Sequence, residues 1–156
     1  MNRAKLAAAA ACLALAACSQ KTPADKRLDE RTVAVGIMAL QWPKVVEANS
    51  EFVVKLAVRN AGGTPLPSQA ATPDGALRVN AAYHWKTTGN QVVVWDGVLT
   101  PLAEDLAPGA EQALDAAVKA PPSPGMYILE FDLVQNSAFW FGGAGSQTAQ
   151  LLVEVR

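Results

Sequence analysis

The sequence predicts an all-β fold, a single antiparallel β-sandwich of about seven strands over residues 32–156. Apolar and polar side chains alternate with period two in several short segments, which is the pattern of half-buried strands. Glycine, proline and asparagine clusters separate these segments, as turns require. The long apolar period of a helix is missing from the same region, so the predicted layers are sheets.

The first two strands are predicted at residues 32–40 and 52–59. Apolar side chains occupy every second position from Phe52 onward, whereas Lys55 and Arg59 lie on the opposite face. This segment therefore has one buried and one solvated face.

Residues 77–85 repeat the alternation and place Trp85 toward the core. His84, the only histidine of the chain, is then expected to face solvent. A turn at 88–90 leads into a short β-branched strand at 91–95.

Three more strands complete the predicted sandwich, at 114–118, 127–133 and 151–155. The alanine-rich 114–118 is the weakest of them, and a helical turn over 110–117 is the alternative. Residues 61–76 contain three prolines and are predicted to form a long loop.

The N-terminus combines a basic start, Arg3 and Lys5, with an apolar run over 6–17. Because this run is shorter than the roughly 20 residues that span a bilayer, it reads as a secretory signal peptide. The run ends in Leu15-Ala16-Ala17-Cys18, which resembles the lipobox of bacterial lipoproteins. The alternative is an ordinary cleaved signal with an incidental cysteine.

The lipobox resemblance implies cleavage after the signal peptide 1–17 and lipid on Cys18, whose acyl chains hold the protein on a membrane. Residues 18–31, polar and charged, then form a tether, and 32–156 form the domain. In bacterial lipoproteins an aspartate after the cysteine favours inner-membrane retention. Ser19 stands there, so the resemblance points to the outer membrane, facing the periplasm.

The charge of the chain argues against a nucleic-acid-binding protein, and its cysteine content argues against a disulfide-bonded domain. The net charge is −1, and loss of the basic signal residues makes the remaining chain more acidic, so nucleic acid is not an expected partner. Cys12 leaves with the signal and Cys18 takes the lipid, so no disulfide within the mature chain is expected.

Two aromatic residues sharpen the fold class. Trp85 on the expected third strand and Tyr127 at the start of the penultimate strand match the buried tryptophan and tyrosine corner of sandwich domains. The segment resembles immunoglobulin-like and fibronectin-type-III-like domains of bacterial surface proteins.

Four short motifs narrow the resemblance to sandwich modules attached to bacterial glycosyltransferases of polysaccharide biosynthesis. They are Tyr83-His84-Trp85, Val94-Trp95-Asp96-Gly97 with Thr100-Pro101-Leu102, Leu106-Ala107-Pro108-Gly109, and Leu133-Val134-Gln135. The similarity runs from about Phe52 to Arg156. Because this fold serves many functions, the resemblance identifies a module and not an activity.

The sequence shows no catalytic, metal-binding or cofactor-binding constellation. His84 has no second histidine or free cysteine to form a zinc or copper site. Glu104, Asp105 and Asp96 are interpreted as solvated loop charges rather than paired glycosidase carboxylates. The glycine-rich 142–146 leads into a strand instead of opening a helix, so it is interpreted as a hairpin and not a phosphate loop.

Aromatic side chains outside the core mark the candidate binding surface. These side chains are Trp95 and the aromatic residues of the hairpin 136–147. They indicate binding because a flat, rigid ring can stack on a partner or a sugar at low entropic cost. Capping of the sandwich is the alternative for the hairpin cluster. Strand alternation predicts that the two phenylalanines pack inward and Trp140 is the more exposed ring. The full candidate surface is Trp140, Phe139, Phe141, Trp95 and Asp96.

These observations favour a membrane-anchored, non-enzymatic envelope lipoprotein that acts as a binding or assembly module. Its expected partners are the membrane, through Cys18, and an envelope protein or glycan. The alternative is a carbohydrate-binding module that works with cell-surface polysaccharide machinery. An enzyme with an unrecognised site is the third hypothesis.

Overall fold

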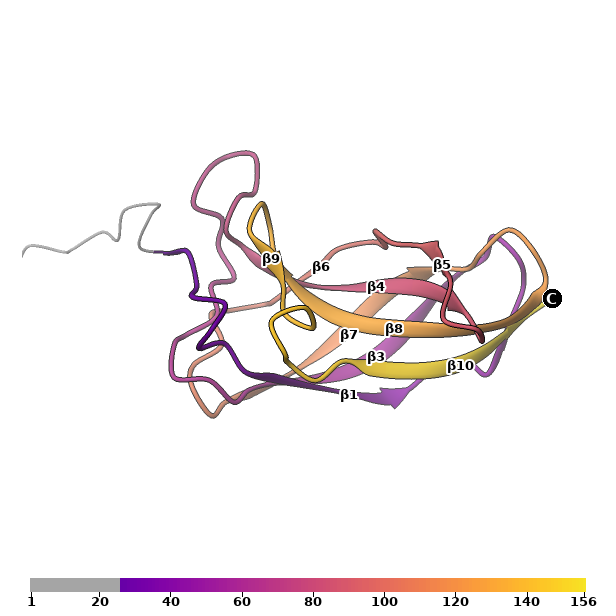
Figure 1. Cartoon of the computed structure of the whole chain (residues 1–156), viewed down its shortest axis with the longest axis horizontal. Coiled ribbons are helices and arrows are strands. Elements are labelled where there is room, and N and C mark those ends of the chain that lie inside the picture. Colours follow the sequence, from indigo (N-terminus) through magenta and orange to yellow (C-terminus); the bar gives the residue numbers. More distant parts are fainter. Residues whose placement is uncertain (1–25) are drawn as a thin grey trace, which may run out of the picture.

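The computed structural model describes residues 26–156, which form two β-sheets packed face to face (Figure 1). The smaller sheet has the order β1-β3-β7. Its strands are β1 (Val35–Gln41), β3 (Glu51–Asn60) and β7 (Glu111–Lys119). The described residues contain no α-helix, and thus no helix long and apolar enough to cross a membrane.

The larger sheet has the order β2-β10-β8-β4-β5, with β6 paired to β4 and β9 paired to β8. Its strands are β2 (Val45–Val46), β4 (Val79–Thr87), β5 (Val92–Val94), β6 (Thr100–Pro101), β8 (Gly125–Gln135), β9 (Phe139–Trp140) and β10 (Ala149–Val155). All pairings are antiparallel except that of β2 with β10. The predicted all-β sandwich is confirmed.

The core lies between the two sheets, and Trp85 is at its centre. The Trp85 side chain is fully buried and makes edge-to-face contacts with Phe52, Tyr83 and Tyr127, with ring centroids 6.0–6.5 Å apart. Its indole Nε1 donates a hydrogen bond of 2.9 Å to the carbonyl oxygen of Lys119. Because Trp85 belongs to β4 and Lys119 to β7, this side chain ties the two sheets together.

Tyr127 forms the tyrosine corner that its position predicts. Its hydroxyl donates a hydrogen bond of 3.0 Å to the carbonyl oxygen of Ser123, four residues upstream. This bond closes the proline-rich turn before β8, so the turn and the strand are held in a fixed relation.

The weakest predicted strand is a strand of nine residues, β7. Leu114, Ala116 and Val118 are buried on its inner face, and Ala116 lies opposite Val54 of β3. Alanine favours a helix in isolation, but pairing along the whole of β3 overrides that preference.

The packed domain begins earlier than predicted. Residues 26–31 were expected to belong to the tether 18–31, but Leu28 is buried in the core cluster. The amide of Gln135, itself fully buried, accepts a hydrogen bond from the Leu28 backbone N–H (3.0 Å) and donates one to the Lys26 carbonyl (2.8 Å). The buried Leu28 side chain and the two hydrogen bonds to Gln135 together dock this segment. The signal peptide, Cys18 and the rest of the expected tether lie outside the described residues.

Candidate functional site

The outer face of the larger sheet, on the side away from the core, buries polar side chains. His84 of β4 and Asp132 of β8 point outward between core residues, yet they are only 3% and 4% exposed. The expectation that His84 faces solvent is therefore wrong. Trp95, directly after β5, and Trp140 of β9 contact its ring, and the two covering segments are residues 95–97 and the turn 142–146 after β9, which lines the same cleft.

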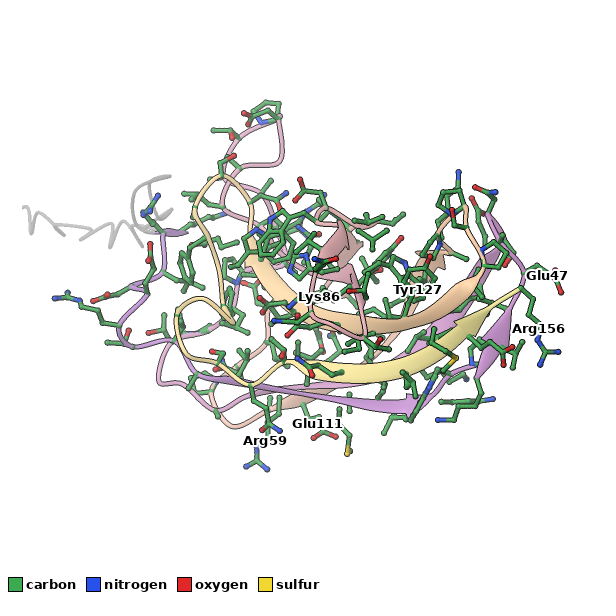
Figure 2. All side chains as sticks on the ribbon, turned by 45° about the vertical axis from the view of Figure 1, so that its right-hand side comes forward. Glu47, Arg59, Lys86, Glu111, Tyr127 and Arg156 are labelled. Atoms are coloured by element: carbon green, nitrogen blue, oxygen red, sulfur yellow. The ribbon has the colours of Figure 1, made fainter. Side chains whose placement is uncertain are left out.

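These segments form a cleft of about 220 Å³ over the centre of the sheet. Its floor consists of His84, Lys86, Glu130 and Asp132, and its walls are Trp95 and the chain from Gly142 to Thr148. Figure 2 shows Lys86 on this face, and Arg59 and Glu111 on the far side of the molecule.

Strand register brings the floor residues together. Glu130 of β8 lies opposite His84 of β4 on one side and opposite Gln150 of β10 on the other. The three side chains therefore form one row across the sheet, and Asp132 occupies the next outward position of β8.

Glu130 forms an ion pair with Lys86 in the floor of the cleft, and their side chains are 10% and 15% exposed. Its Oε1 also accepts hydrogen bonds from Thr148 Oγ1 (2.9 Å) and Gln150 Nε2 (3.0 Å). Burial acts to raise the pKa of Glu130, but the bonds from Lys86, Gln150 and Thr148 outweigh burial and lower it below its usual value. Both oxygens are therefore engaged, and this carboxylate stays ionised.

Asp132 has a different environment. It accepts hydrogen bonds from the backbone N–H groups of Gly142 (2.9 Å) and Leu133 (2.7 Å). No cation forms an ion pair with it among residues 26–156. Burial raises the pKa of Asp132, because the backbone bonds only partly compensate for lost hydration. A Cβ on Gly142 would lie 2.7 Å from Asp132 Oδ2, so the close approach of the turn requires glycine.

His84 is fixed by its neighbours on both sides. Its ring stacks on Trp95, with centroids 4.1 Å apart and planes 19° apart, and meets Trp140 at 4.5 Å. Its Nδ1 is hydrogen-bonded to the carbonyl oxygen of Trp95. Because a carbonyl only accepts, Nδ1 carries a proton, and Nε2 is the ring nitrogen left for a ligand. In the part of the chain that the structure describes, no group hydrogen-bonds to Nε2.

The structure separates the predicted surface residues into two groups. Trp95 is 48% exposed and meets the half-buried Trp140 with ring centroids 6.0 Å apart. Asp96 is exposed beside Trp95. Phe141 is fully buried and stacks on the partly buried Phe139 at 5.1 Å, so this pair packs against the core, as alternation predicts.

The loop 61–76 and the hairpin 136–147 do lie at one end of the sandwich. The Asn136 side chain donates a hydrogen bond of 3.2 Å to the Gly75 carbonyl, and its own carbonyl accepts one of 2.9 Å from the Leu77 N–H. The cleft, however, is on the sheet face beside this end.

Sequence reasoning missed Lys86, Glu130 and Asp132 as site residues. All three occupy outward strand positions, where charge normally indicates solvent. The signal that could have found them is the aromatic motif at Trp95, because a tryptophan beside a turn can cover a neighbouring strand.

No family model matches this sequence, and no curated protein matches it either. Among solved structures, the chain is similar to a CARDB domain from Pyrococcus furiosus in complex with di-metal ions, at 18% identity and a TM-score of 0.45. That similarity covers 80% of this chain and 87% of the other. A Listeria innocua β-glucosidase in complex with glucose is similar at 12% identity and a TM-score of 0.47, over 79% of this chain and 16% of the enzyme. A Pseudomonas fluorescens alkylpurine DNA glycosylase bound to DNA is similar at 12% identity and a TM-score of 0.45, over 80% of this chain and 30% of the enzyme.

Proposed function

We propose that this chain is a non-enzymatic binding module of the bacterial cell envelope and that it engages its partner through the cleft beside Trp95. The observation that carries the proposal is the burial of Asp132 and His84 on the outer face of a sheet, next to a half-exposed tryptophan. A face that only met water would not need the two covering segments.

The buried carboxylate supports binding rather than folding. A buried charge without a counter-ion costs stability, because hydrogen bonds replace its hydration only in part. Groups with raised or lowered pKa values in a cleft are typical of functional sites. Asp132 has such a pKa, faces the cleft and is paired with no cation among the described residues.

The contacts in the cleft favour binding over hydrolysis. Ser146 is the serine that lines the cleft and is thus the candidate nucleophile. Its Oγ accepts a hydrogen bond of 3.3 Å from the Val35 N–H, and among the described residues no hydrogen bond joins it to His84. The His84 Nδ1 is bonded to a backbone carbonyl and not to Asp132. A nucleophile and base within hydrogen-bond reach, oriented by an acid, are what a serine hydrolase needs.

The lipid on Cys18 would hold this module close to a membrane. Because the domain already begins at Lys26, only residues 18–25 separate the lipid from it, and they reach at most about 26 Å. Cys18→Ala is expected to leave uncut precursor, which keeps residues 1–17 and is therefore larger than the mature wild-type protein, and to abolish incorporation of labelled palmitate. Equal size and equal labelling of variant and wild type would reject the lipid anchor.

A crosslinking experiment tests the cleft. Gly143→Cys places a thiol on the rim, and Asp115→Cys places one on the exposed outer face of β7 as a matched control. Each is labelled with a benzophenone maleimide and irradiated in isolated envelopes. We expect a discrete adduct from position 143 and none from position 115. Equal adducts from both positions, or one from position 115 alone, would contradict the proposal.

A glycan is the second candidate partner, and the exposure of Trp95 favours it. A half-exposed indole above carboxylates and a hydroxyl offers a stacking face and polar groups to a sugar ring. A glycan array probed with the protein tests this directly. Binding that survives Trp95→Ala would place a sugar site elsewhere.

A further inference from the structure

The cleft offers a ligand hydrogen-bond acceptors and few donors. Asp132 contributes a carboxylate without an ion pair among residues 26–156, and it lies beside the buried His84, whose Nε2 has no hydrogen-bond partner there. Two donors that line the cleft, Lys86 of the floor and Thr148 of the wall, are directed to Glu130. A ligand that fills this cleft must therefore bring donors of its own.

The charges of the floor sum to a negative value. Glu130 and Asp132 on β8 are carboxylates, whereas Lys86 on β4 is the only lysine or arginine that lines the cleft among the described residues. The covering segment adds the exposed carboxylate of Asp96, next to Trp95. This excess of carboxylates disfavours an anionic ligand, and a cation would supply the counter-charge that Asp132 lacks.

The size and the wall of the cleft restrict the ligand further. A volume of about 220 Å³ is below the roughly 300–1,000 Å³ of pockets that enclose whole small molecules. It suits one side chain or head group. One face of the Trp95 indole is stacked on His84, so only the other face of this half-exposed ring is free to attract an ammonium or guanidinium group.

We infer that the cleft binds an ammonium or guanidinium group, supplied by a lysine or arginine side chain of a partner protein or by a free amine. This inference rests on the proposed function and names the chemistry of its ligand. The bound cation donates to the Asp132 carboxylate, in the cleft that His84 and Trp95 also line. Since burial raises the pKa of Asp132, ion pairing in the complex would lower that pKa again.

The test uses the full mature protein in detergent micelles, with ¹⁵N-labelled tryptophan. The four indole N–H signals report different places, because Trp95 and Trp140 contact His84 whereas Trp85 is in the core and Trp42 lies beside Lys44. The probes are Nα-acetyl-lysine-N-methylamide, its neutral Nε-acetylated form, and butylamine.

We expect the lysine probe to shift the signals of Trp95 and Trp140 saturably and to leave Trp85 and Trp42 unchanged. The neutral form should bind at least tenfold more weakly. Asp132→Asn, with a melt to verify folding, should weaken the lysine probe at least tenfold, whereas the surface change Glu154→Gln should not. Butylamine as tight as the lysine probe would identify a free amine as sufficient, and a preference for lysine would favour a protein source.

Two results separate this inference from the proposed function. Equal binding of the neutral and cationic probes, or no shift with either, would overturn the cation assignment. If the position-143 adduct still forms in that case, the cleft binds another chemistry and the proposed function stands. If the adduct also fails to form, the proposed function falls with it.

Discussion

Glu130 and Asp132 are two carboxylates on the same strand face whose pKa values shift in opposite directions. Burial raises the pKa of both groups. For Glu130, bonds from Lys86, Gln150 and Thr148 reverse the effect, but Asp132 has only backbone donors. We therefore assign a structural role to the first carboxylate and a binding role to the second.

The first assignment predicts a pH-dependent loss of stability. Because the pKa of Glu130 is lower in the folded chain than its unfolded value of 4.5, its ionised form stabilises the protein above about pH 4.5, and this contribution is lost as pH falls through the folded pKa. Glu130→Gln leaves Lys86 without its partner in the floor of the cleft. We expect it to lower the free energy of unfolding by about 3 kcal/mol at pH 7 and by less in acid.

Urea unfolding at a series of pH values measures this difference. Glu154→Gln is the matched control, because Glu154 pairs with Arg156 at the surface and its loss should cost less than about 1 kcal/mol. Equal effects of the two substitutions would mean that the Lys86–Glu130 pair contributes no more than a surface pair.

At the scale of elements, the segment 95–97 places Trp95 over the sheet, and Gly97 fixes that segment. The Gly97 N–H donates a hydrogen bond of 3.0 Å to the Tyr83 carbonyl. A Cβ at position 97 would lie 2.5 Å from the Tyr83 ring and 2.6 Å from its carbonyl oxygen. The segment can therefore approach β4 only with glycine at this position.

Gly97→Ala is accordingly expected to lower the free energy of unfolding by about 1–3 kcal/mol and to displace Trp95 from His84. Thermal melts measure the first effect, and near-ultraviolet circular dichroism reports the second. Gly63→Ala serves as the control, since an added Cβ there has open space. An unchanged dichroism spectrum in the Gly97 variant would show that this glycine does not determine the position of Trp95.

The strands of the sandwich could be predicted from sequence because alternation is a local signal. It located β3, β4, β8 and β10 and the inward direction of Trp85. The two-residue strands β6 and β9 could not be predicted, since they form only where a partner strand lies beside them. The cleft could not be predicted from the sequence either, because His84 is buried by Trp95 and Trp140, which come from other parts of the fold.

At the scale of the whole molecule, the docked segment at Lys26 and the cleft are related through the larger sheet. The segment at Lys26 docks at the end of β8 through Gln135, at the same end as β9 and its turn (Figure 1). If lipid on Cys18 anchors the protein, as we propose, the loop end of the sandwich would be the part nearest to the membrane. The cleft, on the sheet face, would remain open to a partner from the side.

If the outer-face cleft serves binding and the interior serves stability, substitutions of two tryptophans have opposite effects. Trp85→Ala should lower the free energy of unfolding by about 3–5 kcal/mol, because the ring fills the core and its Nε1 bonds to Lys119. Trp95→Ala, at a half-exposed ring, should cost less than about 1 kcal/mol.

The decisive measurement pairs each melt with the adduct yield from the labelled position 143, at a temperature where both variants remain folded. We expect Trp85→Ala to keep the adduct despite its lower stability and Trp95→Ala to lose the adduct while its stability is unchanged. A Trp95→Ala protein as destabilised as Trp85→Ala, or one that still forms the adduct in full, would contradict this expectation.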